Sequence, residues 1–364
     1  MKKLTYVISV GRSIPPYQME QAEAKMLVKE LFRYTSKQVD RLLPVFDNAE
    51  VKARQFVVDV PWFKKEHTFE EKNQLYQKYA LEHALKASDD CLHNMDFLKT
   101  PIPYEAIDMI IFVSSTGLAT PTIDAHLLNE RPFRENLIRV PLWGLGCAGG
   151  AMGLARAFDW TTAYPQAAVL VICCELVSLT FQKGDVKKSN IVGTALFGDG
   201  ISAALIIGEK SPLLSYRKKS TPKIIAASSF TKRNSTGVMG WNITNSGLEV
   251  VFSKSIPALI HSFWKEHINE FIREQNLHKD AIHSFIAHPG GKKVLEAMEE
   301  VLNCSRDKLY YSYQVLKHHG NMSSATVLHV LGQWMKENIR QGEKSILSAL
   351  GPGFSSELLA LEWE

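Results

Sequence analysis

The chain has 364 residues, of which 45% are hydrophobic and 22% charged, as in globular proteins that bury a large core. The formal net charge of +4, from 42 basic and 38 acidic residues, excludes a generally basic surface for nucleic acid. No apolar stretch approaches the roughly 20 residues that span a bilayer, which excludes an integral membrane protein.

The cysteines give no sign of a metal site or a disulfide framework. The five of them stand at positions 91, 147, 173, 174 and 304, without metal-ligand spacing, and their number is odd. Free thiols are typical of reducing compartments. We therefore expect a cytoplasmic protein without a bound metal.

Strand and helix patterns alternate along the chain, which predicts an α/β protein. Segment 1–10 is predicted to be a strand rather than a secretory signal, because its apolar run is short and no small-residue cleavage site follows. Apolar runs at 108–115, 167–176 and 200–209 are predicted to be buried strands. Between them, 150–164 has apolar residues at helical spacing.

A segment with prolines and basic residues, 209–223, predicts a boundary inside the chain. We expect two halves, residues 1–215 and residues 216–364, each built from strands and helices. The second half repeats the order of elements in the first, with weak identity of the letters but similar spacing.

The repeat gives matching positions to residues that are far apart in the sequence. Cys147 lies 39 residues after Asp108, and Asn321 lies 38 residues after His283. Cys147 and Asn321 each open a helix of small residues, while His288 ends the apolar strand of the second half. If the halves pack about a pseudo-two-fold axis, these three side chains converge on one cleft.

Cys147 stands where a glycine-rich turn passes into a helix, in WGLGCAGGAMGL. A helix N-terminus favours the thiolate and is expected to lower the pKa of the thiol. Glycine permits close backbone approach at such a turn. The alternative is a buried structural cysteine, which we expect for the other four.

The glycines of the same turn also match the motif of a dinucleotide-binding site. Gly144, Gly146 and Gly149 fit G-x-G-x-x-G, and Glu175 ends the next strand as a ribose-binding acid would. The match lies in the middle of the chain and leaves the second half unexplained. An NAD-dependent dehydrogenase is therefore a remote alternative.

His288 and Asn321 are the predicted partners of the thiol. His288 precedes a Pro-Gly-Gly turn, and Asn321 stands at a helix start, where an N-cap role is the alternative. A nucleophilic Cys147 can take an acyl group from a thioester. Imidazole and amide N–H groups can stabilise the enolate that forms when a second thioester loses CO₂. This predicts a carbon–carbon condensing acyltransferase.

Six motifs together resemble the type III polyketide synthases, the chalcone synthase-like branch of the thiolase superfamily. They are GLGCAGG around Cys147, LTFQ at 179–182, ALFGDG at 195–200, HPGG from His288, GNMSSA from Gly320 and GPG at 351–353. WGLGCAGGAMGLARA and SSTGLATPT resemble bacterial alkylpyrone and alkylresorcinol synthases. The resemblance covers nearly the whole chain.

The resemblance implies a five-layered αβαβα thiolase fold and a homodimer. It implies an acyl-CoA starter, malonyl-CoA as extender, and no metal or redox cofactor. The implied site residues are Phe197 as the gate, Thr180 in the cavity wall, Ser115, Glu175 and Ser323 at positions associated with cyclisation, and Gly351, Pro352 and Gly353 at the cavity floor. Basic residues that can meet the CoA phosphates are Lys292, Lys293, Arg41, Lys52 and Arg54.

The sequence departs from the plant enzymes at the gate. Their second gatekeeping aromatic falls on Val250, with Phe252 two residues on, and Pro44 and Asn48 replace two basic residues that bind CoA. A smaller gate favours a slim fatty acyl starter, extended repeatedly and cyclised to an alkylpyrone or alkylresorcinol. The alternative is a β-ketoacyl synthase III-like enzyme, which condenses once.

Overall fold

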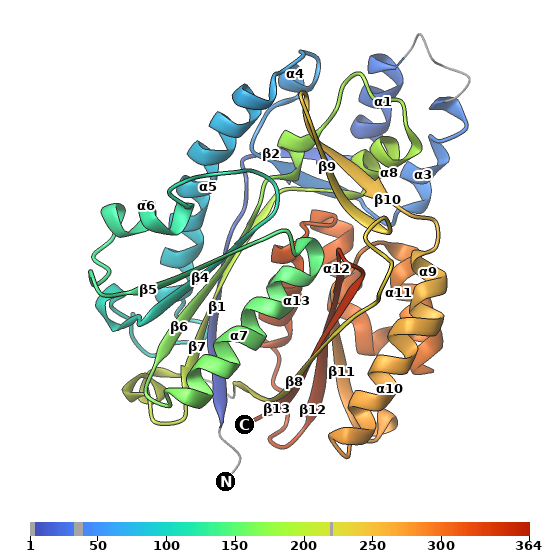
Figure 1. Cartoon of the computed structure of the whole chain (residues 1–364). Helices are drawn as coiled ribbons and strands as arrows, with labels where there is room; N and C mark the ends of the chain where they lie inside the picture. Colours follow the sequence, from blue (N-terminus) through green and yellow to red (C-terminus); the bar gives the residue numbers. More distant parts are fainter. Residues whose placement is uncertain (1–3, 33–38, 219–220) are drawn as a thin grey trace.

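The computed structural model describes residues 4–32, 39–218 and 221–364 (Figure 1). Its centre is a nine-stranded sheet in the order β11-β12-β13-β8-β1-β7-β6-β4-β5. These strands are β1 (Thr5–Ser13), β4 (Met109–Ser114), β5 (Ile138–Trp143), β6 (Ala168–Glu175), β7 (Gly200–Gly208), β8 (Pro222–Thr231), β11 (Ile282–Ala287), β12 (Lys344–Gly351) and β13 (Ser355–Trp363). The strands predicted at 108–115, 167–176 and 200–209 are confirmed as β4, β6 and β7.

The two halves of the sheet mirror each other about the junction of β1 and β8. Outward from it run β1, β7, β6 and β4 on one side and β8, β13, β12 and β11 on the other. β4 pairs in parallel with β6 as β11 does with β12, and the inner pairs of both halves are antiparallel. The predicted repeat is therefore confirmed, and β5 is an additional edge strand of the first half.

Two helices lie between the half-sheets. β1 and β8 are joined only at Thr5↔Ile224 and Tyr6↔Lys223, so the sheet splits into two fans beyond this point. α7 (Gly149–Ala163) and α13 (Ser324–Trp334) contact strands of both fans, and Figure 1 shows α7 between them. The helix predicted at 150–164 is confirmed as α7.

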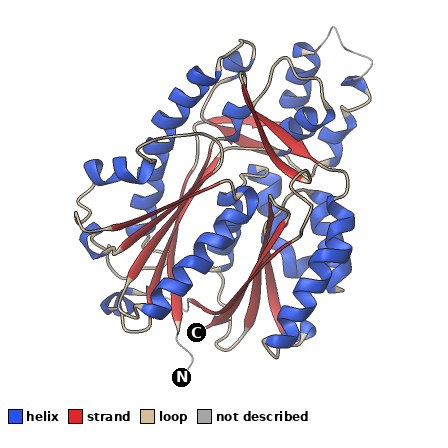
Figure 2. Ribbon diagram, in the orientation of Figure 1, coloured by secondary structure: helices blue, strands red, loops and turns tan. Residues whose placement is uncertain are grey.

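Further helices cover the outer faces of the fans (Figure 2). α5 (Phe69–Leu92) packs on β1, β6 and β7, and α10 (Lys265–Glu274) packs on β13. α11 (Lys292–Leu302) joins α10 in a second apolar core. The order helix, sheet, helix, sheet, helix gives the five layers that were expected.

Most of the smaller elements lie at the end of the molecule where the central helices begin (Figure 1). They are the pair β2 (Tyr17–Glu20) and β3 (Ala53–Phe56), the hairpin β9 (Met239–Thr244) and β10 (Gly247–Phe252), and helices α1 (Gln21–Leu31), α3 (Pro44–Asn48), α4 (Val60–Phe63), α8 (Lys188–Leu196) and α12 (Tyr310–His319). Helix α6 (Ile123–Glu130) packs on α5 and β5 at one flank, and α9 (Ile256–Leu259) packs on α11 at the other. Within the described residues, no helix is long and apolar enough to cross a membrane.

Candidate active site

Cys147 lies in a short 3₁₀ turn, Gly146–Ala148, that leads directly into α7. Gly146 has a φ of 47°, which glycine adopts without strain, and a Cβ there would lie 2.8 Å from the Pro352 ring. A Cβ on Gly351 would meet the Leu145 carbonyl at 2.6 Å. The Gly351-Pro352-Gly353 turn therefore packs against the cysteine turn.

The starts of α7 and α13 meet, as the repeat predicted. A Cβ on Gly150 would lie 2.3 Å from the Ser324 carbonyl oxygen, so only glycine permits this approach. The contact brings Cys147 Sγ to 3.8 Å from Asn321 Oδ1 and 3.9 Å from Asn321 Nδ2. The thiol of one half and the amide of the other thus share one site.

Asn321 is held in place by the backbone around it. Its Oδ1 accepts the Ser323 N–H at 2.8 Å, and its Nδ2 donates to the Gly290 carbonyl at 3.4 Å. The N-cap of α13 is Ser323, so Asn321 does not have the N-cap role considered as the alternative, and its bond to the Ser323 N–H closes a turn just before the helix. The same side chain also contacts Cys147, so this bond orients an amide toward the nucleophile.

His288 follows β11 and is 3% exposed. Neither ring nitrogen has a hydrogen-bond partner among the described residues. Burial lowers the pKa of the imidazole to about 3, so the ring is neutral at physiological pH. A neutral imidazole offers one N–H donor and one acceptor, and both are available to a substrate.

The thiol of Cys147 differs from the expectation of a lowered pKa. Burial raises its pKa to about 11, with a further rise from the Glu175 carboxylate, while Ser323 and Asn321 oppose it by hydrogen bonds. The residue lies before the first turn of α7, and His288 is neutral, so the imidazole supplies no positive charge to the thiolate. The free enzyme therefore holds a thiol.

Glu175 ends β6 beneath the nucleophile and is fully buried. Its Oε1 accepts the Ser324 hydroxyl at 2.6 Å, and its Oε2 accepts the Ser115 backbone N–H at 3.0 Å. Burial raises the pKa of this carboxyl to about 7. The expected set of Ser115, Glu175 and Ser323 is thus differently connected, because Ser324 rather than Ser323 bonds the carboxylate.

The predicted residues Ser115 and Ser323 lie in or contact the turns that precede the two central helices. The Ser115 hydroxyl accepts the Gly146 N–H at 3.0 Å, which fixes the cysteine turn. Ser323 precedes α13 with a φ of 49° and a ψ of −127°, a rare conformation for a residue with a Cβ. Strained backbone of this kind clusters at functional sites.

Aromatic rings pack together at the predicted gate, and Phe197 is bridged to Asn321 through the backbone. Phe197 stacks on Phe252 with ring centroids 5.5 Å apart and lies 6.2 Å from the Trp241 ring. Val250 lines a cavity of about 40 Å³ together with Phe197 and Thr180. The ring that stacks on Phe197 therefore comes from Phe252, two residues further along β10 than Val250.

Arg54 is placed inside the protein rather than at a surface that a CoA phosphate can reach. It is 0% exposed, and burial lowers the pKa of its guanidinium to about 9. Its Nη1 donates to the carbonyls of Thr194 at 2.6 Å and Phe197 at 3.5 Å, and its Nη2 donates to Gln21 Oε1 at 2.6 Å. Arg54 thus holds the end of α8 and the gate.

The remaining basic residues lie at the surface. Lys293, Arg41 and Lys52 are exposed. Lys292 pairs with Glu50 at 3.5 Å. Each keeps a charge that can meet an anion, and they remain candidates for the CoA phosphates.

Asp199 is a site residue that the sequence reasoning missed. It is fully buried two residues after the gate Phe197, and burial raises its pKa to about 6. Its carboxylate accepts the N–H and hydroxyl of Ser178 at 2.7 and 2.6 Å, and the N–H of Val57 at 2.8 Å. It therefore ties the gate to the turn that carries Thr180. The ALFGDG motif contains this aspartate, but only the structure shows its partners.

Comparisons with known proteins place these features in a family. Residues 3–211 match the sequence model of the N-terminal domain of chalcone and stilbene synthases, and residues 224–362 match that of the C-terminal domain. The chain is 46% identical to a putative chalcone synthase of Bacillus subtilis, over 99% of each chain. It is 30% identical to the 1,3,6,8-tetrahydroxynaphthalene synthase of Streptomyces peucetius, over 99% of this chain and 93% of the relative. The crystal structure of the Streptomyces coelicolor 1,3,6,8-tetrahydroxynaphthalene synthase, a bacterial type III polyketide synthase, superimposes with a TM-score of 0.88 at 25% identity, over 99% of each chain.

Proposed function

This chain belongs to the chalcone and stilbene synthase family as a type III polyketide synthase, and from that premise we propose that it extends a fatty acyl starter on Cys147. Such enzymes are acyltransferases of the thiolase fold that use CoA thioesters. The observation that carries the proposal is the contact between Cys147 Sγ and Asn321, whose amide also donates to the carbonyl of Gly290 in the turn that follows His288.

The first step is loading of the starter. The Cys147 sulfur attacks the thioester carbonyl of acyl-CoA, the bond from that carbonyl to the CoA sulfur breaks, and CoA leaves as the thiol. Because the pKa of Cys147 is about 11, its proton must leave during the attack. Neutral His288 has an acceptor nitrogen for this proton and can pass it to the departing CoA sulfur.

The second step is the condensation. Malonyl-CoA bound beside the acyl-cysteine loses CO₂, and the electron pair of the broken bond forms an enolate on its thioester. An imidazole N–H from His288 and the Asn321 amide stabilise the enolate oxygen. The enolate carbon attacks the acyl carbonyl, the bond to Cys147 breaks, and a β-ketoacyl-CoA forms. All groups come from this chain and its CoA substrates, so the proposal needs no metal or redox cofactor.

The starter class rests on the gate. Val250 leaves a space that a phenylalanine would fill, which favours a flexible aliphatic chain over a rigid aromatic one. The cavity of about 40 Å³ is far smaller than a fatty chain, so binding requires the stacked rings of Phe197 and Phe252 to separate. Repeated extension and cyclisation would then give alkylpyrones or alkylresorcinols.

The proposal includes a homodimer in the cytoplasm. β5 is the edge strand of the sheet, and Ile138 and Trp143 at its ends are 40% and 48% exposed. Exposed apolar edge strands invite pairing with another chain. Antiparallel pairing of two β5 strands would join the sheets of two copies. The five cysteines are all free, which supports a reducing compartment.

Product analysis tests the proposal. The enzyme is incubated with malonyl-CoA and acyl-CoAs from acetyl to palmitoyl, p-coumaroyl-CoA included, and the products are identified by mass spectrometry. We expect triketide or tetraketide products from medium- or long-chain starters at the highest kcat/KM. Single condensation with an acyl carrier protein would support the β-ketoacyl synthase III-like alternative. Faster turnover of p-coumaroyl-CoA, or product from malonyl-CoA alone at the highest rate, would refute the fatty starter.

A further inference from the structure

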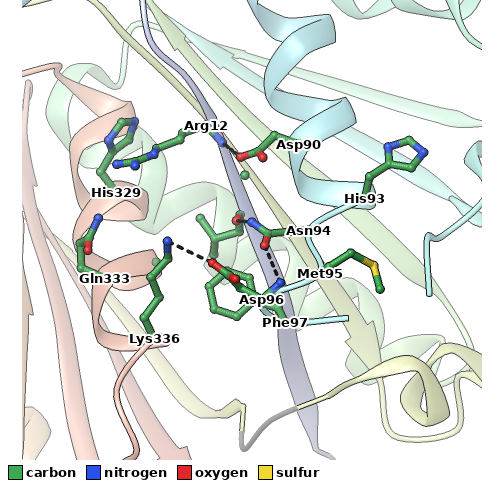
Figure 3. A pocket seen from close by; sticks show the side chains of 13 residues that line it. Arg12, Asp90, His93, Asn94, Met95, Asp96, Phe97, His329, Gln333 and Lys336 are labelled. Atoms are coloured by element: carbon green, nitrogen blue, oxygen red, sulfur yellow. Dashed lines mark hydrogen bonds and ion pairs between the residues drawn. The ribbon is translucent and has the colours of Figure 1, made fainter. Parts of the chain in front are cut away.

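A second cavity, of about 350 Å³, lies between the two halves of the chain and shares no lining residue with the gate cavity (Figure 3). Its walls come from β1 with Arg12, from the last turn of α5 with Asp90, from the residues after α5, and from α13 with His329 and Gln333. The volume lies within the range of small-molecule sites. The proposed condensation makes no use of this cavity.

The cavity carries charges of both signs. Figure 3 shows Asp90 and Asp96 on the α5 side and Gln333 and Lys336 on the α13 side, with the Arg12 side chain running toward α13. Lys336 pairs with Asp96 at 3.3 Å. Within the described part of the chain, the Arg12 guanidinium makes no ion pair, and Asp90 accepts only the Arg12 backbone N–H, at 2.8 Å. One cation and one anion are therefore left without a counter-ion.

His329 adds an unpartnered group to the cavity wall. The residue is 3% exposed, its Nε2 lies 3.4 Å from the Ile201 carbonyl, and its Nδ1 has no partner among the described residues. Burial, and then the charges of His319 and Arg12, lower the pKa of this ring, so it is neutral. Because Nε2 faces a carbonyl, it carries the proton, and Nδ1 is an acceptor without a donor.

The charged side chains of this cavity disfavour a ligand that carries a single charge. A simple anion that binds Arg12 meets the carboxylates of Asp90 and Asp96, and a simple cation meets Arg12 and Lys336. A molecule with one ammonium and one carboxylate satisfies both charges, with its carboxylate on Arg12 and its ammonium on Asp90, and His329 Nδ1 accepts a further donor of the ligand. We propose that this cavity is a binding site for a small zwitterion of the amino-acid class.

The site also has a physical link to the catalytic residues. α13 starts three residues after Asn321 and carries His329 and Gln333 further along the same helix. A ligand that contacts α13, β1 and α5 together therefore restricts the movement of α13, and the start of α13 positions the Asn321 amide.

Isothermal titration calorimetry on the full chain tests the proposal. Each common amino acid is titrated in turn, with sodium acetate and ethylammonium chloride as ligands that carry only one of the two charges. We expect saturable binding of at least one amino acid and at least tenfold weaker binding of both single-charge controls. Arg12→Gln and Asp90→Asn should each weaken that binding about tenfold or more, because each removes one charged partner.

The control variant is Arg273→Gln, which removes an exposed arginine from α10 and should leave binding unchanged. Asp90→Asn keeps an oxygen that can accept the Arg12 backbone N–H, so we expect this variant to fold. It therefore tests the proposal even if Arg12→Gln does not fold. The proposal is overturned if no amino acid binds at 10 mM, if acetate or ethylammonium binds as tightly, or if binding survives in a folded Asp90→Asn variant.

Discussion

Phe197 and Asn321 are joined through their backbones in an isolated parallel bridge. The Asn321 N–H donates to the Leu196 carbonyl at 2.8 Å, and the Gly198 N–H donates to the Asn321 carbonyl at 3.1 Å. Two backbone hydrogen bonds therefore tie the proposed gate residue to the proposed catalytic amide. A movement of the gate backbone that admits a substrate also moves the amide that contacts Cys147, so opening by side-chain rotation is the less costly route.

Arg54→Lys tests the support beneath this unit. A lysine ammonium cannot reach the carbonyls of Thr194 and Phe197 and the Gln21 oxygen together, so acceptors remain unsatisfied inside the protein. We expect a loss of about 1–3 kcal/mol in the free energy of unfolding, measured by urea denaturation. Arg41→Lys at the exposed surface is the matched control and should change it by less than about 0.5 kcal/mol. Equal stability of the two variants would contradict the structural role of Arg54.

The roles of Cys147 and Asn321 can be separated with malonyl-CoA alone. Decarboxylation needs the enolate donors but no nucleophile, so Cys147→Ala should lose extension completely and still release acetyl-CoA. Asn321→Ala removes an enolate donor and should lower decarboxylation by about 10²–10³-fold. Acetyl-CoA is quantified by mass spectrometry. Cys304→Ala, at a partly exposed thiol elsewhere, should match the unmodified enzyme. If Asn321→Ala decarboxylates normally, the amide does not stabilise the enolate.

The pKa of Cys147 can be measured through its reactivity. Burial raises the pKa of the Cys147 thiol to about 11, so the thiol is protonated at neutral pH. At any pH below that pKa, the thiolate fraction increases about tenfold for each unit by which the pH rises. The rate of inactivation by iodoacetamide should therefore keep rising through pH 9.5. A plateau near pH 7 would show a low pKa and would restore the expectation based on the helix start.

The convergence of Cys147 and Asn321 could be predicted from the sequence because a repeat carries spatial information. Equivalent helix starts in two similar halves must meet near the axis that relates them, whatever the details of packing. His288 is placed at a strand end by the same reasoning.

The electrostatics of the site could not be predicted in this way. The pKa of Cys147 depends on burial and on Glu175, which approaches from another strand. Arg54 stands two residues after the exposed Lys52, so the sequence predicts that both belong to one basic surface, but the Arg54 side chain is buried. Ser323 and Ser324 are adjacent, and only the structure shows that the Ser324 hydroxyl donates to Glu175 while Ser323 adopts a positive φ.

Val250→Phe tests the starter class. A ring at this position fills the cavity beside Phe197. It also crowds Gly193, because a Cβ built on that glycine would lie only 3.4 Å from a methyl group of Val250. We expect kcat/KM for a long-chain acyl-CoA to fall at least tenfold while the value for acetyl-CoA falls much less. Ile243→Phe, on the exposed face of β9, is the control and should leave both values unchanged. A uniform loss for all starters would mean that the gate does not select chain length.

The edge strand β5 gives the last prediction, which concerns assembly. Figure 1 shows β5 at the margin of the sheet, and its exposed Trp143 lies in an apolar groove of about 510 Å³ that also includes Leu118. Trp143→Asp places a charge where two copies would bury this strand, and burial of an unpaired charge is costly. Light scattering after gel filtration should give twice the chain mass of 40.9 kDa for the unmodified protein and a lower mass for the variant. Tyr164→Asp, at an exposed aromatic beyond the end of α7, is the matched control and should leave the mass unchanged. A monomer mass for the unmodified protein at micromolar concentration would refute the dimer, and an unchanged dimer of Trp143→Asp would place its interface away from β5.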